Sequence, residues 1–201
     1  MQSVDSRILN RIRGAGRGSV FSPSHFLDLR SRDAVGQALS RLARKGTLRR
    51  LARGLYDYPR PHPVLGVAAP PPEAVAKALA GRHGIRLQPS GAYAANLLGL
   101  STQVPAKIVF LTDGPSRIVR VGNQEIRLVR TTPRNMGPAR RISGTVIQAL
   151  RYLGQAQVDA AVIRTLRRKL RPADKQQLLR DLPFAPAWVG AHLRAIARRE
   201  A

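Results

Sequence analysis

The amino-acid sequence predicts an α+β protein with two domains, on three observations. Its 201 residues are 43% hydrophobic, which is enough for packed cores in a chain of this length. Apolar residues recur at helical spacing near both ends of the chain and alternate as in strands in the middle. Proline is so dense in residues 59–72 that a helix is excluded there. We therefore expect one domain at 1–58, an extended linker at 59–72 and a second domain at 73–201.

The first domain is predicted to begin with two helices and a short extended segment. Ile8 and Ile12 lie on one side of the first helix, which ends at a Gly-Ala-Gly sequence. Residues 19–21 are typical of a small strand. Ser22 followed by Pro23 is typical of an N-cap and a first helical residue, so a second helix is expected to start there.

A third predicted helix, from Ser31 to about Lys45, has two distinct faces. Ser31 is a suitable N-cap, and Gly46 ends the helix. The apolar stripe consists of Val35, Leu39 and Leu42. The polar face, displaced by two residues, consists of Gln37, Arg41 and Arg44. We expect the first face to pack on the other helices and the second to stay open to solvent.

A basic β-hairpin over residues 47–58 is predicted to follow this helix. Helix, helix, charged helix and basic hairpin are the pattern of a winged helix-turn-helix, whose last helix enters the major groove of DNA. Glutamine pairs with the edge of adenine and arginine with that of guanine, while hairpin arginines meet phosphates or the minor groove. The alternative is an ordinary solvated helix face, because arginine and glutamine are good helix formers.

Nine side chains form the predicted DNA-binding set. Those expected to read bases are Gln37, Arg41 and Arg44. Those expected to hold phosphates are Arg49, Arg50 and Arg53 on the hairpin. The set is completed by Arg32, Ser40 and Lys45.

The second domain is predicted to be mixed α/β and to close with helices. Its expected elements are helices at 73–81 and 92–98, strands at 85–87 and 107–111, a hairpin at 117–130, and helices from Ser143 onward. Four arginines near the end repeat at helical spacing: Arg164, Arg167, Arg168 and Arg171. They form either a second phosphate-contacting surface or a solvated helix face, and the basic composition favours the solvated face.

The strongest compositional feature is charge, with 35 basic and 11 acidic residues and a net charge of +24. Residues 1–60 carry a net +9, residues 61–130 carry +5 and residues 131–201 carry +10. Such an excess implies a polyanionic partner, of which nucleic acid is the usual one. A non-specific RNA- or ribosome-associated factor is a second interpretation, but aromatic residues make up only 4% of the chain, few for stacking single strands.

The sequence gives little indication of an enzyme. There is no cysteine, and the histidines, at 25, 62, 83 and 192, lack metal-ligand spacing. Asp113, Glu125 and Arg127 suggest a metal-dependent nuclease, but an arginine stays protonated and cannot act as a base. Ser90 lacks the surroundings of a nucleophile and is more simply a turn or helix cap. We expect a binding protein without catalytic residues, metal or cofactor, and, lacking an apolar span or secretory signal, a cytoplasmic one.

Several segments are similar to one known family. They are Ser22–Phe26, Ala38–Gly46, Gly54–Pro59, Gln88–Pro105 and Lys107–Arg117. Together they resemble AbiEi-type antitoxins over most of residues 1–132, while the last seventy residues are similar only in being helical and basic. The resemblance implies a type IV toxin–antitoxin antitoxin whose winged helix represses its own operon by binding promoter DNA. It also implies that the second domain counters a nucleotidyltransferase toxin without a stable complex between the two proteins.

Overall fold

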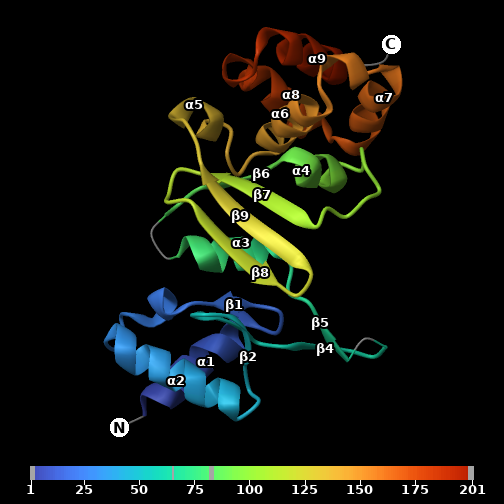
Figure 1. Cartoon of the computed structure of the whole chain (residues 1–201). Helices are drawn as coiled ribbons and strands as arrows, with labels where there is room; N and C mark the ends of the chain where they lie inside the picture. Colours follow the sequence, from blue (N-terminus) through green and yellow to red (C-terminus); the bar gives the residue numbers. More distant parts are fainter. Residues whose placement is uncertain (1–2, 65, 82–83, 199–201) are drawn as a thin grey trace. The chain divides into compact units, whose positions relative to one another are not determined.

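The computed structural model describes residues 3–64, 66–81 and 84–198 and has the mixed α/β structure that the sequence predicts (Figure 1). The chain forms two compact units. The first consists of Met1–Ile85 with Arg117–Ile126, and the second of Arg86–Ser116 with Arg127–Ala201. The division therefore falls beyond the Pro-rich segment at 59–72, where the sequence analysis places the domain boundary.

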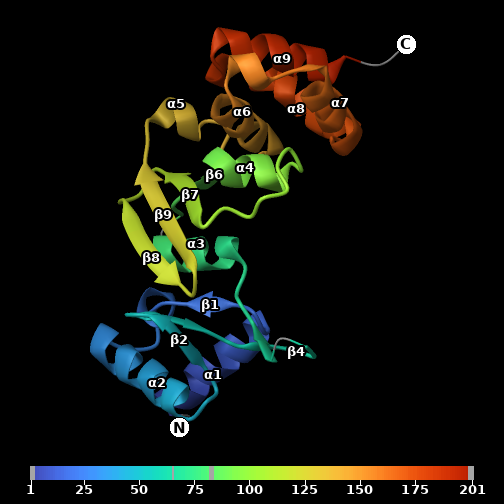
Figure 2. The ribbon, with the colours of Figure 1, turned by 45° about the vertical axis from the view of Figure 1, so that its right-hand side comes forward.

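The N-terminal part of the first unit packs two helices on a small antiparallel sheet. Its elements are α1 (Val4–Ala15), β1 (Val20–Phe21), the 3₁₀ turn η1 (Pro23–Phe26), α2 (Arg32–Arg44), β2 (Arg49–Ala52) and β3 (Leu55–Asp57). The sheet has the order β1-β3-β2, and α1 lies against α2 (Figures 1 and 2). The predicted stripe of α2 is confirmed, since Val35, Leu39 and Leu42 are all buried in the core.

The second predicted helix is wrong in extent, because only one 3₁₀ turn forms after Ser22 and Pro23. Ser22 does take the N-cap position, and its backbone N–H donates to Nδ1 of His25. Within the segment Phe26 is fully buried, whereas Leu27 is exposed. A short helix depends on burying an apolar face, so one buried side chain gives too little stabilisation to extend the turn.

The Pro-rich segment is extended, as predicted, but it also pairs with itself. Strands β4 (Arg60–His62) and β5 (Gly66–Ala68) form an antiparallel hairpin. In both views this hairpin extends away from α1 and α2 (Figures 1 and 2). The helix α3 (Pro72–Ala80) follows, within one residue of the predicted bounds. Strand pairing was not predicted, because proline lacks a backbone N–H donor. A two-stranded ribbon consists of edge strands only, and edge strands accommodate a proline such as Pro61.

The middle of the chain supplies a four-stranded sheet in the order β6-β7-β9-β8. Its elements are β6 (Leu87–Ser90), β7 (Lys107–Thr112), β8 (Arg117–Val121), β9 (Gln124–Arg130) and the intervening helix α4 (Gly91–Leu97). The predicted β7 strand and β8–β9 hairpin are confirmed. Strand β6 lies later than the predicted 85–87 and includes Pro89, which an edge strand accommodates.

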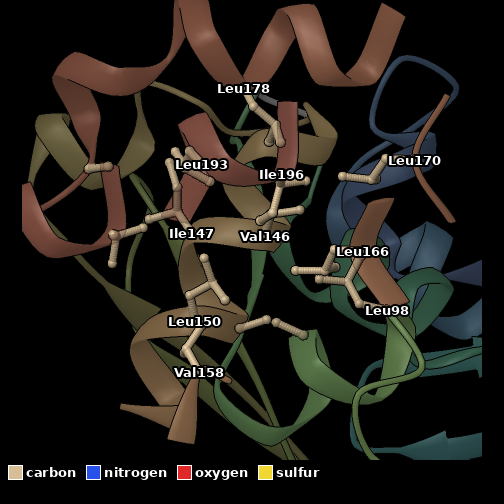
Figure 3. Packing of buried hydrophobic residues seen from close by; sticks show 14 of the residues in the cluster. Leu98, Val146, Ile147, Leu150, Val158, Leu166, Leu170, Leu178, Leu193 and Ile196 are labelled. Carbon is tan, nitrogen blue, oxygen red and sulfur yellow. The ribbon is translucent and has the colours of Figure 1, made fainter. Parts of the chain in front are cut away.

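The second unit closes with helices around one apolar cluster. They are α5 (Pro133–Met136), α6 (Ile142–Leu153), α7 (Ala160–Lys169), α8 (Pro172–Arg180) and α9 (Ala187–Ala197), with 3₁₀ turns at Gln155–Gln157 and Leu182–Phe184. Figure 3 shows Ile147, Leu150, Leu166 and Leu193 among the apolar side chains of this cluster. Within the described residues, no helix combines the length and apolarity needed to cross a membrane.

Candidate nucleic-acid interface

An open groove of about 850 Å³ lies between α2 and the turn that joins β2 to β3. Six of the nine predicted residues line it: Arg32, Gln37, Ser40, Arg41, Arg44 and Arg53. A neighbouring hollow of about 640 Å³ shares three of the groove's lining residues and adds Arg49 and Arg50. Lys45, the C-cap of α2, is exposed but lines neither hollow. We call the two hollows together the α2–hairpin groove.

The floor of the α2–hairpin groove is made by Tyr56 of β3. Its ring is buried, and its hydroxyl lies 3.1 Å from the Oγ atom of Ser40 on α2. This hydrogen bond ties the helix to the hairpin at the point where the two walls of the groove meet. The hairpin turn itself requires Gly54, whose φ of 70° lies in the left-handed region.

Arg41, a predicted base reader, is held by a carboxylate from α1. Its Nε donates to one oxygen of Asp5 at 3.0 Å and its Nη2 to the other at 2.7 Å. The hydrogen bond from Arg41 lowers the pKa of Asp5 below its usual range, although partial burial acts in the opposite direction. The Asp5 carboxylate therefore stays ionised at neutral pH and holds one edge of the guanidinium.

Arg49, a predicted phosphate contact, is engaged inside the first unit. Its Nε and Nη2 donate to the two oxygens of Asp57 at 3.1 and 2.6 Å, and Nη2 also donates to the carbonyl of Ala68 at 3.0 Å. Only 1% of the Asp57 side chain is exposed. Arg49 thus neutralises a buried carboxylate and fastens the β4–β5 hairpin to β2 and β3.

The remaining predicted side chains are exposed and available to a ligand. None of them makes a hydrogen bond or ion pair to another described residue: Arg32, Gln37, Arg44, Lys45, Arg50 and Arg53. Lys45 interacts electrostatically with Asp5, and Asp33 also lines the groove. The arginines outnumber that one carboxylate, so the lining of the α2–hairpin groove is net positive.

Gly36 is a groove residue that the sequence analysis missed. It lies inside α2 and lines the α2–hairpin groove, and a Cβ placed on it would meet nothing within 4 Å. Glycine inside a helix costs about 1 kcal/mol relative to alanine, and no internal packing explains that cost here. A glycine that interrupts an otherwise strong helical pattern is the signal that would have found it. Its absent side chain leaves room for a ligand to approach the helix backbone.

The residues considered for catalysis serve other contacts. Asp113 accepts hydrogen bonds from the backbone N–H and the Nε of Arg86, at 2.8 and 2.7 Å, and the side-chain bond lowers the pKa of Asp113. Ser90 is the N-cap residue of α4, as predicted. His83 lies outside the described residues, and among those described no group of three or more His, Asp or Glu side chains could hold a metal ion.

The four arginines predicted near the end of the chain lie on α7 and, for Arg171, at the N-cap of α8. The guanidinium of Arg167 donates to the carbonyl of Ala195, and Arg171 pairs with Asp174 three residues away. Arg164 and Arg168 are exposed. Two of the four predicted side chains, Arg167 and Arg171, are thus engaged within the second unit.

Fold and groove together define a strongly basic α+β protein in which several exposed arginines gather between a helix and a hairpin. The chain belongs to the family described as "Family of unknown function (DUF6088)", whose pattern matches residues 7–178. The matched region includes all of α2, the β2–β3 hairpin and the four-stranded sheet. No curated protein matches the sequence.

Proposed function

We propose that this protein binds double-stranded DNA through a winged helix-turn-helix and represses its own promoter. The observation that carries the proposal is the α2–hairpin groove, where a polar helix face and an arginine-bearing hairpin turn converge. The order α1, β1, η1, α2, β2, β3 and the sheet order β1-β3-β2 agree with a winged helix in which η1 replaces the second helix.

Each wall of the groove suits a different part of a duplex. α2 fits the major groove, where Gln37 and Arg44 reach base edges and Gly36 permits a close approach of the helix. Arg50 and Arg53 on the hairpin lie where phosphates flank the groove. Arg41 joins the base-reading set, whereas Arg49 acts mainly through Asp57.

The scarcity of exposed aromatic side chains among the described residues favours a duplex over a single strand as the ligand. Proteins that bind single strands stack bases on exposed aromatic rings. Of the aromatic side chains that the structure describes, only that of Tyr152 is largely exposed, and it lies on α6 of the second unit. The positive groove of the first unit therefore has no stacking platform.

The antitoxin part of the proposal rests on the resemblance of residues 1–132 to AbiEi-type antitoxins. In this view the first unit supplies autoregulation, and the second counters a nucleotidyltransferase toxin without a stable complex. The test is co-expression with a nucleotidyltransferase toxin from the same operon. We expect growth to be rescued by the wild type and by the groove variant Arg44→Ala. Failure of the wild type to rescue would remove the antitoxin role and leave the repressor.

The first measurement is binding of the purified protein to its own upstream DNA and to a random duplex of equal length, across salt concentrations. We expect tight, sequence-dependent binding that persists near physiological salt. Equal affinities with a steep dependence on salt would mean that the net charge alone drives binding, and the repressor would be excluded. RNA would then be the ligand to test.

A further inference from the structure

We propose that Asp5 is a specificity-determining residue, which acts by fixing the Arg41 guanidinium in the orientation that reads one base pair. The inference rests on the proposed DNA-binding function and names how one position of the operator is chosen. Asp5 belongs to α1 and does not line the α2–hairpin groove, so no DNA-binding pattern in α2 or the hairpin points to it.

The first step concerns which donors Asp5 occupies. An arginine side chain has five N–H groups. The carboxylate accepts from Nε–H and from one N–H of Nη2, which together form the side edge of the guanidinium. Three N–H groups stay free on Nη1 and Nη2. Two of them, one on each terminal nitrogen, form the parallel pair that the O6 and N7 atoms of guanine require.

The second step concerns access. While paired with Asp5, the Arg41 side chain keeps 43% of its surface exposed, and it lines the α2–hairpin groove beside Gln37 and Arg44. Its guanidinium is thus held at one edge and open to solvent at the rest. An arginine side chain without an internal partner loses much rotamer freedom when it binds DNA, whereas the Arg41 side chain, already held by Asp5, loses less.

The third step separates base contact from phosphate contact. Asp5 places a negative charge next to Arg41, which disfavours a phosphate oxygen at the same site but not the acceptor atoms of a neutral base. Arg44 has no such carboxylate and makes no ion pair within the described residues. The structure therefore assigns Arg41 to discrimination between bases, and leaves Arg44 free to adapt to bases or phosphates.

The test measures the affinity of Asp5→Asn for the operator, for operator variants and for a random duplex. Arg41→Ala first identifies the base pair at which its preference is lost. At that base pair we expect Asp5→Asn to lose about tenfold in discrimination. Affinity for the random duplex should stay equal or tighten up to about threefold, because a like charge near the phosphates is removed. The double variant should lose no more discrimination than Arg41→Ala alone.

The chain offers a matched control in the pair of Arg11 with Asp28. This pair is also bidentate, at 2.8 and 2.7 Å, and similarly exposed, but neither residue lines the groove. Asp28→Asn should therefore keep full discrimination. Arg41→Lys, which keeps the charge but not the planar fork, should lose discrimination as Asp5→Asn does.

Three results would overturn the inference. Full discrimination by Asp5→Asn would show that the carboxylate positions nothing. An equal loss of affinity on every duplex, accompanied by lower thermal stability than that of Asp28→Asn, would show a purely structural role. Equal affinities of the wild type for operator and random DNA would overturn the proposed function itself and this inference with it.

Discussion

The first sixty residues and the last seventy-one carry almost the same net charge, +9 and +10, but use it differently. In the first region Arg44, Arg50 and Arg53 surround one groove without internal partners among the described residues. In the second, Arg167 and Lys169 donate to backbone carbonyls, while Arg171 pairs with Asp174. Net charge therefore predicts a polyanionic partner but does not locate the surface that binds it. The candidate surface is located instead by the gathering around one groove of arginines that are unpaired among the described residues.

The largest expected effect is a loss of stability when a buried carboxylate loses its arginine partner. Each region has one such pair, Arg49 with Asp57 and Arg141 with Asp181. Asp57 accepts side-chain hydrogen bonds from Arg49 alone among the described residues, so Arg49→Ala leaves a buried charge unpaired. We expect a loss of about 3 kcal/mol in the free energy of unfolding. Urea denaturation followed by circular dichroism measures it.

Arg141, the partner of buried Asp181, provides the comparison. Asp181 also accepts from the Ser143 hydroxyl and from Nε2 of Gln177, so it keeps two donors when Arg141 is replaced. Arg141→Ala should cost about half as much as Arg49→Ala. A larger loss for Arg141→Ala would show that the number of remaining donors does not decide the cost.

The next effect tests where DNA binds. Removing two groove arginines in Arg44→Ala with Arg50→Ala should weaken operator binding about a hundredfold, because each contacts DNA directly. Removing the same number of charges in Arg164→Ala with Arg168→Ala should change the affinity less than about threefold. Fluorescence anisotropy at near-physiological salt measures both. Similar losses in the two double variants would make net charge, and not the groove, responsible for binding.

Sequence patterns predicted most of the secondary structure because periodicity and turn residues are local signals. The α2 stripe, the β7 strand and the β8–β9 hairpin are where the sequence places them. The short η1 and the pairing of β4 with β5 were not predictable, because burial and partner strands decide them.

The candidate site was predictable as a list of exposed cations but not as a set of contacts. The same polar face of α2 contains Arg41, paired with Asp5, and Arg44, which has no partner among the described residues. Spacing cannot distinguish them, because Asp5 lies 36 residues away from Arg41 in the chain. The sequence likewise does not distinguish Arg49 from Arg50, because only the folded structure shows that Arg49 pairs with the buried Asp57.

Two helical glycines should respond to alanine in opposite directions. A Cβ added to Gly144 of α6 would lie 2.6 Å from the backbone carbonyl oxygen of Pro138, so Gly144→Ala should destabilise the second unit by about 2 kcal/mol. A Cβ added to Gly36 of α2 would meet no atom within 4 Å, so Gly36→Ala should stabilise the first unit by up to about 1 kcal/mol. The same variant should weaken operator binding about fivefold, because the added methyl faces the duplex. Gly36→Ala with unchanged DNA affinity would exclude close approach at this point of α2.

The smallest effect is a pH dependence that should separate the two regions. Hydrogen bonding from arginine lowers the pKa of Asp5 in the first unit and of Asp113 in the second. A lowered folded-state pKa contributes stability at pH values above the ordinary pKa of an aspartate, and that stability is lost as the pH falls through the lowered value. Both pairs are partly exposed and screened by solvent, so each contributes only a small part of the stability. The single tryptophan, Trp188, lies in the second unit and reports its unfolding. Between about pH 7 and pH 3 the tryptophan-detected stability of Asp113→Asn should fall less than that of the wild type, whereas that of Asp5→Asn should fall as much. An equal response of Trp188 fluorescence to both variants would mean that the two units unfold as one, and that the contrast between the regions does not extend to their stability.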